Sequence, residues 1–395
     1  MNLLFVTDIF PYPPHSGSAV ISFHWARSLA PRHRVLLLSA LPGKDEGAVQ
    51  QLERIGISVA ACRESFLRPR GVQHAASRLP IAMRRLRLLE FRAALERAVE
   101  THNAHVVVVI SAGMGALLPR RRLHPPLVFV PYDAESVNFA MRARDGRDPI
   151  RRAYYRIETL KWRFVEANYY PLADACVAVT EPDAEAISRS WAASARARIR
   201  VIPNGVDTAQ FAPLQSPEVS DRLLISGNLA SFDTAFSVKW FLHGVWPQIR
   251  RQVPTATVEI VGRDPLPSLS SLTAKFSGVN LWGYVPDLRP HLAQAGVYVA
   301  PLRLGSGAKN RVLEAMAMGR PVVATPLAIQ GLRVQPGRDV VVATTEDDFA
   351  EAVVGLLRDD DRRKQIGMAA RGVIVANHSW TVISDRVEDL LHSLI

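Results

Sequence analysis

Short apolar runs alternate with helix-like segments along the whole chain of 395 residues, and this alternation indicates an α/β fold. The runs lie at 3–7, 35–38, 106–110, 127–130 and 175–179 in the first half, and at 223–226, 257–261, 297–300 and 322–324 in the second. Runs that are apolar at nearly every position are typical of parallel strands covered on both faces. Strands that alternate with helices predict doubly wound sheets with helices on both sides.

The two halves are separated by a segment with the chemistry of turns. Pro203–Pro217 contains three prolines, the pair Asn204-Gly205 and few apolar residues, which is typical of a linker. A chain of this length is expected to form about two domains. We therefore predict two Rossmann-like domains with the boundary at residue 205.

Several protein classes are disfavoured. The longest apolar stretch, Val106–Leu118, is too short to span a bilayer and contains glycines, so we interpret it as a buried strand followed by a turn. No basic residue precedes the short apolar run at the N-terminus, which argues against a signal peptide. Cys62 and Cys176 provide neither a disulfide framework nor metal-binding spacing. A cytoplasmic protein is expected.

The net charge of +11 is concentrated in the first half. Residues 1–205 contain 29 basic and 18 acidic side chains, whereas residues 206–395 are balanced. Such an excess keeps a protein soluble or attracts an anionic partner. A membrane surface or a phosphorylated lipid acceptor fits, while nucleic acid is disfavoured because no nucleic-acid-binding signature is present.

Two basic clusters could contact the inner face of the cytoplasmic membrane peripherally. Nine arginines and two acids lie between Arg54 and Arg92, and the segment 79–89 mixes bulky apolar and basic residues as an interfacial helix does. The alternative is that Leu86 and Leu89 pack into the domain while the arginines are solvated. The second cluster consists of Arg142, Arg144, Arg147, Arg151, Arg152 and Arg156.

The strongest chemical signal lies between 300 and 319. A strand ends at Ala300, a loop with two glycines follows, and a helix is expected to begin near residue 308 with Lys309 and Arg311 in its first turn. Cations there oppose the helix dipole, but a bound diphosphate would favour them. Glu314, one turn further, could accept hydrogen bonds from ribose hydroxyls. The alternative is an ordinary solvated loop and helix, with Glu314 paired to a nearby cation.

This stretch, GSGAKNRVLEAMAMGRPVV, resembles the signature of family 4 glycosyltransferases of the GT-B fold, in the subgroup with a Gly-Ser-Gly loop before EAMAMGRPVV. FPYPPHSG, VIPNGVD, GYVPDL and Ser379-Trp380 resemble further motifs of the family, in the same order. The resemblance implies two Rossmann-like, doubly wound domains facing across a cleft. Residues 1–205 would bind the acceptor, residues 206–379 would bind the nucleotide sugar, and a last helix, 380–395, would cross back to the first domain.

The resemblance also implies roles for matching residues. Glu314 matches the second glutamate of the family's Glu-x7-Glu motif, whereas Ser306 replaces the first, and Tyr132 replaces a histidine that faces the sugar in many relatives. The expected catalytic residues are Lys309, Arg311 and Tyr132. Asp133 and Glu135 are acceptor-side candidates, with helix capping as the alternative. The expected donor-binding residues are Gly17, Asn228, Arg263, Tyr284, Val285, Gly305, Ser306, Gly307, Leu313 and Glu314.

Together these features predict a retaining glycosyltransferase that moves a sugar from a nucleotide diphosphate sugar to an acceptor hydroxyl, by front-face attack, in polysaccharide or glycolipid assembly. No cofactor or metal is expected, because an Asp-x-Asp metal motif is missing and Asp359–Asp361 is interpreted as a helix cap. Three alternatives remain: a natural-product glycosyltransferase, a sugar-nucleotide 2-epimerase, and a non-catalytic GT-B scaffold. The changes at Ser306 and Tyr132 motivate the last.

Overall fold

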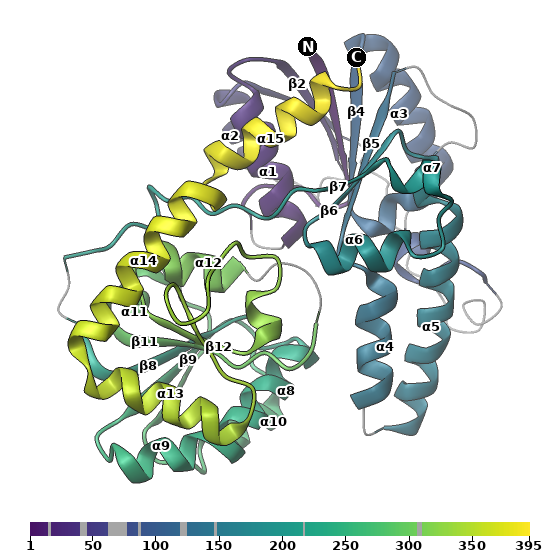
Figure 1. Ribbon diagram of the computed structural model, residues 1–395. Helices are drawn as coiled ribbons and strands as arrows, with labels where there is room; N and C mark the ends of the chain where they lie inside the picture. The colour runs from purple at the N-terminus through teal and green to yellow at the C-terminus, as the bar shows by residue number, and fades with distance from the viewer. Residues whose placement is uncertain are drawn as a thin grey trace. The chain divides into compact units, whose positions relative to one another are not determined.

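The computed structural model describes residues 1–14, 17–39, 46–61, 77–85, 88–118, 125–145, 148–215, 218–305 and 310–395. It divides into two compact units (Figure 1). The N-unit comprises Met1–Asn204 and Trp380–Ile395, and the C-unit comprises Gly205–Ser379. Ser306, Gly307 and Lys309 lie outside the described residues, as do Cys62, Leu86 and Arg147.

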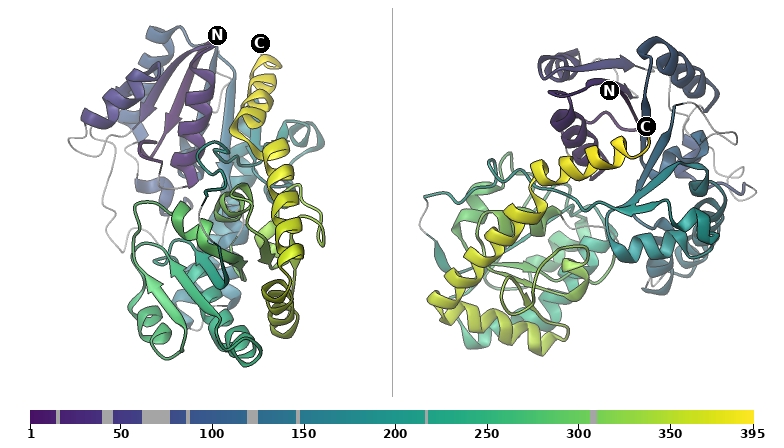
Figure 2. Two further views of the ribbon diagram at one scale, coloured as in Figure 1. Left: turned by 90° about the vertical axis from the view of Figure 1, so that its left-hand side faces the viewer. Right: turned by 45° about the horizontal axis from the view of Figure 1, so that its top comes forward.

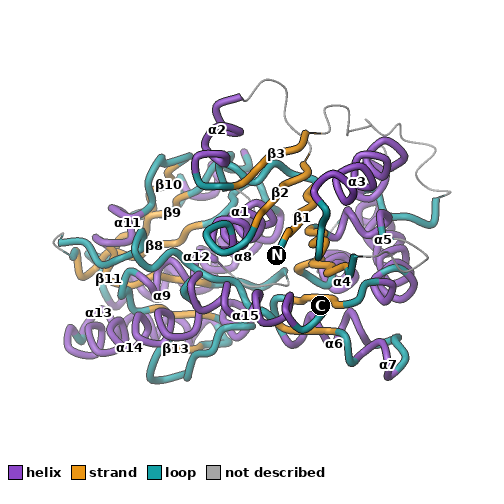
Figure 3. Tube along the Cα trace, turned by 90° about the horizontal axis from the view of Figure 1, so that it is seen from above, coloured by secondary structure: helices purple, strands orange, loops and turns teal. Residues whose placement is uncertain are grey.

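The N-unit is built on a parallel sheet with the order β3-β2-β1-β4-β5-β6-β7. Alternate residues of these strands enter cores on opposite faces, and Leu4, Val6, Val107 and Val109 share a core with Phe91 of α3. Figure 3 shows α1 on one side of β1–β3 and α3 on the other. The strands are β1 (Asn2–Thr7), β2 (Arg34–Ser39), β3 (Ile57–Ala61), β4 (Val106–Ile110), β5 (Leu127–Tyr132), β6 (Ala175–Ala178) and β7 (Ile199–Val201).

The helices of the N-unit cover both faces of this sheet. They are α1 (Gly17–Leu29), α2 (Glu46–Arg54), α3 (Leu88–His102), α4 (Glu135–Asp145), α5 (Pro149–Asn168), α6 (Glu181–Ser188), α7 (Ala193–Arg196) and α15 (Trp380–His392), with short 3₁₀ turns η2 (Ala82–Arg85), η3 (Ala112–Leu117) and η4 (Tyr170–Leu172). The predicted last helix begins at Trp380 and packs on α1, as Figure 2 shows. The apolar stretch from Val106 forms β4 followed by η3, as predicted.

The segment 79–89 differs from the interfacial helix considered above. Its described part before α3, residues 79–85, contains the single turn η2, and α3 begins at Leu88. Met83 is fully buried and Leu79 packs against the same core. The Ile81 amide donates to a Glu158 carboxylate oxygen at 3.2 Å, which ties the segment to α5. The side chains of Leu79 and Met83 are therefore not available to a membrane.

The C-unit repeats the architecture with a parallel sheet of order β10-β9-β8-β11-β12-β13. Leu223 and Ile225 enter the core on one face, and Leu224 enters the core on the other. The strands are β8 (Val219–Ser226), β9 (Thr257–Val261), β10 (Val279–Trp282), β11 (Ala295–Ala300), β12 (Val322–Ala324) and β13 (Val341–Val342). The helices are α8 (Phe232–Trp240), the π-turn η5 (Phe241–Val245), α9 (Trp246–Gln252), α10 (Pro267–Thr273), α11 (Arg289–Gln294), α12 (Asn310–Ala317), the 3₁₀ turn η6 (Pro326–Ile329), α13 (Glu346–Arg358) and α14 (Asp360–His378).

Each sheet has one point at which the strand order reverses. In the N-unit this point lies between β1 and β4, and in the C-unit it lies between β8 and β11. Ligands of doubly wound sheets bind at the carboxyl ends of the strands flanking such a reversal. Each unit therefore offers one position where a site is expected. Within the described residues, every helix is too short or too polar to cross a bilayer.

Candidate functional site

The reversal point of the C-unit carries a pocket of about 240 Å³. The ends of β8 and β11, the start of α8 and the first turn of α12 form its walls. Asn228, a predicted donor-binding residue, and Arg311, a predicted catalytic residue, both line it. The pocket is lined by Ile225, Ser226, Gly227, Asn228, Thr234, Ser237, Val238, Tyr298, Val299, Ala300, Pro301, Leu302, Asn310, Arg311 and Val312.

Arg311 and Glu314 form an ion pair across the first turn of α12. Arg311 donates to Glu314 Oε2 at 2.6 Å, and the side chains are 49% and 14% exposed. Burial raises the pKa of the Glu314 carboxyl above its ordinary value, and the Arg311 guanidinium opposes that rise. Glu314 is thus paired with a nearby cation, which was the alternative to a role in ribose binding. A guanidinium has five N–H donors, so Arg311 can hold Glu314 and still reach an anion in the pocket.

Polar groups and close backbone packing shape the floor of this pocket. The Tyr298 hydroxyl lies 3.1 Å from Ser226 Oγ, and burial raises the pKa of Tyr298 to about 12, which keeps it protonated. A Cβ on Gly262 would lie 1.9 Å from the Gly227 carbonyl oxygen, so the ends of β8 and β9 approach this closely only because residue 262 lacks a side chain.

The other predicted donor-site residues of the C-unit are dispersed. Gly305 is partly buried with φ 104°, a conformation that favours glycine. Leu313 is fully buried in the core, so only its backbone is available to a ligand. Tyr284 is 65% exposed beyond β10, and Val285 packs beside the core of the unit. Arg263, after Gly262, is partly buried.

The reversal point of the N-unit holds a polar cluster that contains Tyr132, a predicted catalytic residue, together with Asp8 and Ser111, which were not predicted. The Ser111 hydroxyl, at the end of β4, donates to Asp8 Oδ2 at 2.8 Å, at the end of β1. Asp8 Oδ1 is buried and has no hydrogen-bond partner among the described residues. The Tyr132 hydroxyl, from β5, is also buried and without a partner in that part of the chain, although the hydroxyls of Ser18 and Ser22 lie near it.

Strain and desolvation mark this cluster as more than a structural contact. Ser111 has φ 112° and Tyr132 has φ 71°, a region that costs non-glycine residues of the order of 1–3 kcal/mol each. Burial raises the pKa of Asp8, and burial together with the Asp8 charge raises the pKa of Tyr132 well above its ordinary value. Unpaired buried polar atoms, strained backbone and shifted pKa values gather at binding sites.

The acceptor-side candidates lie at the start of α4, beside this cluster in sequence. Asp133 is partly buried, and Glu135 is the first residue of the helix. The helix N–H groups are capped by other residues: Ala134 N donates to Asp183, and Ser136 N donates to Glu166 Oε1 at 2.9 Å. Burial, followed by the charge of Asp133, raises the pKa of Glu135 to about 7. Gly17, the remaining candidate, is exposed at the start of α1.

One group of described residues has the spacing of metal ligands. His33, Glu388 and His392 place ligand atoms within 4.8 Å of one another. Glu388 already accepts from Arg32 at 2.6 Å and contacts His33 at 2.7 Å, so the group works as an ion-pair network that fastens α15 within the N-unit. Asp359 caps α14 by accepting from Arg362 N, as predicted.

Two family models match the chain in sequence. The model described as Glycosyltransferase Family 4 matches residues 15–210, and the model described as Glycosyl transferases group 1 matches residues 220–359. A GDP-mannose-dependent monoacylated alpha-(1-6)-phosphatidylinositol monomannoside mannosyltransferase from Corynebacterium glutamicum is 28% identical over 214 residues, covering 49% of this chain and 55% of that protein. The chain thus spans about half the length of this curated relative.

Solved structures match over the whole chain. Sucrose-phosphate synthase from Thermosynechococcus elongatus gives a TM-score of 0.75 at 16% identity, covering 100% of this chain and 99% of the other. Anabaena HepE in complex with UDP and glucose gives a TM-score of 0.66 at 15% identity, covering 100% of both. These likenesses confirm the predicted GT-B fold, with two parallel-sheet domains.

Proposed function

We propose that this chain, which belongs to the group 1 glycosyltransferases of family 4, transfers a sugar from a nucleotide diphosphate sugar to an acceptor hydroxyl with retention at the anomeric carbon. The observation that carries the proposal is the C-unit pocket beside a strand-order reversal, which Arg311 lines from the start of α12 while it is ion-paired to Glu314. The GSG-loop subgroup, defined by Gly305, Ser306 and Gly307, is part of the same proposal.

Different residues of the C-unit bind different parts of the donor. Glu314 accepts hydrogen bonds from the ribose hydroxyls, and Arg311 holds it in place. The diphosphate is bound by Arg311, Lys309 and the N–H groups at the start of α12. In the transition state the bond from the anomeric carbon to the diphosphate oxygen breaks and a bond to the acceptor oxygen forms. The acceptor proton passes to the diphosphate, and preorganised cations stabilise the charge that develops there. We propose that no metal is required.

The N-unit cluster binds the acceptor hydroxyl. Asp8 Oδ1 and the Tyr132 hydroxyl, both buried without a hydrogen-bond partner among the described residues, supply one acceptor and one donor, which match the two hydrogen-bonding needs of a sugar hydroxyl. Ser111 fixes the Asp8 carboxylate from its other oxygen. Satisfying these buried groups on binding favours a hydroxylated acceptor over an apolar one.

The acceptor is proposed to be lipid-linked, in glycolipid or polysaccharide assembly, with the protein bound peripherally to the inner face of the cytoplasmic membrane. Two observations support this proposal. One is the basic excess of residues 1–205, and the other is the name of the Corynebacterium glutamicum relative, which contains phosphatidylinositol monomannoside.

A thermal-shift screen of UDP- and GDP-sugars tests the donor site. A ligand at 100 times its dissociation constant adds about 2.7 kcal/mol of stability, which for a unit of this size raises Tm by roughly 5–10 °C. Donor hydrolysis is then measured without acceptor. Slow release of nucleoside diphosphate indicates a catalytically competent site, whereas a non-catalytic scaffold releases none. If no nucleotide sugar shifts Tm, or if Glu314→Ala leaves the shift intact, the proposed donor site is wrong. Glu351→Ala, an exposed change on α13, is the matched control.

A further inference from the structure

Helix α5 exposes an apolar stripe that nothing in the proposed donor and acceptor sites uses. Its members recur every three or four residues and therefore share one face. Trp162 and Val165 are buried on another side of the helix. The helix therefore has one buried apolar face and one that is largely exposed, on which Tyr154 contacts Phe139 and Phe164 contacts Tyr169. No other described helix exposes more than two large apolar side chains. The stripe consists of Ile150 (80% exposed), Tyr154 (41%), Ile157 (46%), Leu160 (64%) and Phe164 (37%).

A row of arginines borders this stripe. Arg152, Arg156 and Arg163 lie at spacings of four and seven residues, so they follow one side of α5 between its packed and exposed faces. Together with Arg144 of α4 they line a groove of about 440 Å³ that also includes Thr159 and Leu160. The exposed stripe and the arginine row therefore meet at Leu160.

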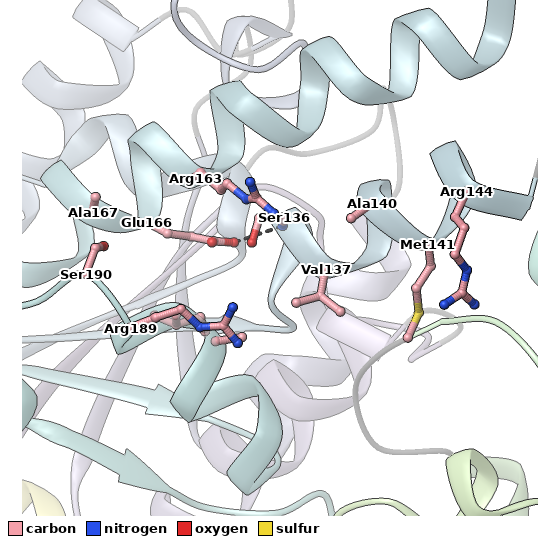
Figure 4. A pocket seen from close by; sticks show the side chains of 12 residues that line it. Ser136, Val137, Ala140, Met141, Arg144, Arg163, Glu166, Ala167, Arg189 and Ser190 are labelled. Atoms are coloured by element: carbon pink, nitrogen blue, oxygen red, sulfur yellow. Dashed lines mark hydrogen bonds between the residues drawn. The ribbon is translucent and has the colours of Figure 1, made fainter. Parts of the chain in front are cut away.

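The groove continues into a larger cavity of about 540 Å³ between α4, α5 and the end of α6 (Figure 4). Arg144 and Arg163 line both spaces, and Arg189 is added on the α6 side. Figure 4 shows the hydrogen bond that the Ser136 backbone N–H donates to Glu166, with Arg163 beside these two residues. Apolar side chains, including Val137, Met141 and Ile187, supply the rest of the lining.

The arginines of this surface are only partly neutralised. Arg144 pairs with Asp145, and Arg152 donates to the Ala143 carbonyl oxygen at 3.3 Å. No ion pair joins a described carboxylate to Arg156 or Arg163. The Arg163 charge lowers the pKa of the buried Glu166, although burial raises that pKa overall to about 7. Unpaired guanidinium groups beside exposed apolar side chains match a ligand with a phosphate head and an apolar body.

We propose that α5 and the adjoining arginine groove, together called the α5 surface, bind an anionic phospholipid bilayer. The apolar stripe enters the boundary of the acyl chains, and Arg156 and Arg163 contact lipid phosphates. An interfacial helix combines these two features, and each engaged arginine strengthens binding to an anionic surface about fivefold. This inference deepens the proposed function, because it locates the membrane contact on one surface of the N-unit. It rests on the proposed function only for the idea that the acceptor is lipid-linked.

Co-sedimentation of the full chain with vesicles tests the proposal. Vesicles of phosphatidylcholine alone are compared with vesicles that also contain phosphatidylglycerol. Arg156→Gln with Arg163→Gln should weaken binding to the anionic vesicles roughly 25-fold, about fivefold for each arginine. Ile157→Ser with Leu160→Ser should weaken it by roughly tenfold for each side chain removed from the acyl boundary. The matched control is Arg362→Gln with Met368→Ser, two exposed positions on α14, which should bind as the parent does.

The two pairs of variants should also differ in their response to salt. The serine pair should retain salt-sensitive attraction, whereas the binding of the glutamine pair should depend less on salt, because only the charge contribution is screened. Equal binding by all variants, or no binding to either vesicle, would overturn the proposal. Binding of a soluble polyanion that displaces the vesicles and depends on the arginines alone would point to another partner. Nucleoside diphosphate binding measured in the same samples reports separately on the proposed donor site.

Discussion

Replacing Glu314 by alanine tests the donor site directly, because this side chain has two distinct partners. Its Oε2 is held by Arg311 at 2.6 Å, and the carboxylate is 14% exposed. Two ribose hydrogen bonds to a charged acceptor contribute roughly 1.5–3 kcal/mol each. Their loss should therefore weaken nucleoside diphosphate binding by at least about 100-fold. The broken ion pair should cost at most about 1 kcal/mol of folding stability, because Arg311 is half-exposed and screened by water.

Calorimetry with a nucleoside diphosphate and its 2′,3′-dideoxy analogue separates the ribose contacts from general damage. The parent protein should bind the dideoxy ligand as weakly as Glu314→Ala binds the natural one. The variant should not distinguish the two ligands, because the group that reads the hydroxyls is gone. The double comparison isolates the coupling between residue and hydroxyls. A variant that still prefers the ribose form by the parental factor would remove Glu314 from the site.

Three further outcomes are expected. Replacing Lys309 and Arg311 by Met should lower kcat more than it raises the donor KM in steady-state assays, since charge develops chiefly in the transition state; near-normal turnover would place the diphosphate elsewhere. Asp8→Asn should lower kcat/KM by roughly 10- to 100-fold, because the site loses a charged hydrogen-bond acceptor. Its Tm should stay equal or rise, because a buried charge without a cationic partner is removed. A fall in Tm with unchanged kcat/KM would show that Asp8 has a structural role. Because burial raises the pKa of Glu166 from 4.5 to about 7, the folded state binds the extra proton, so stability should fall as pH rises from about 5 to 7. Glu166→Gln should flatten that fall in urea titrations, and an unaltered slope would assign it to other groups.

The sequence predicts central strands well and edge strands poorly. Val106–Ile110 and Thr257–Val261 were predicted with the bounds that the structure has, because strands buried on both faces are apolar at nearly every position. The four edge strands, β3, β7, β10 and β13, were missed. β3 has the sequence Ile-Ser-Val-Ala-Ala, and β10 contains Asn280 and an exposed Trp282. An edge strand needs fewer buried positions, so its apolar signal is weak.

The candidate sites also differ in how far the sequence predicts them. The Arg311–Glu314 pair could be predicted because both residues lie in one turn of a helix after a glycine loop. Asp8 and Ser111 could not, because 103 positions separate them and only the pairing of β1 with β4 brings them together. For α5, the sequence shows arginines among apolar residues on all sides, and periodicity alone does not say which apolar face the domain packs. Only the fold shows that Trp162 lies inside while Leu160 lies outside.

The distribution of charge indicates that the two units attract anions by different means. Residues 206–395 are electrically balanced, so the donor diphosphate is not drawn in by the net charge of that half. It would be held at short range by Arg311, the neighbouring loop and the start of α12, in a pocket where screening by salt is weak. Residues 1–205 carry the whole excess, and on α5 that charge is exposed to solvent. Attraction from exposed charges acts over the Debye length and falls steeply with ionic strength. Raising salt should therefore release the chain from anionic vesicles well before it reduces nucleoside diphosphate affinity, and the two losses should occur together only if one surface served both ligands.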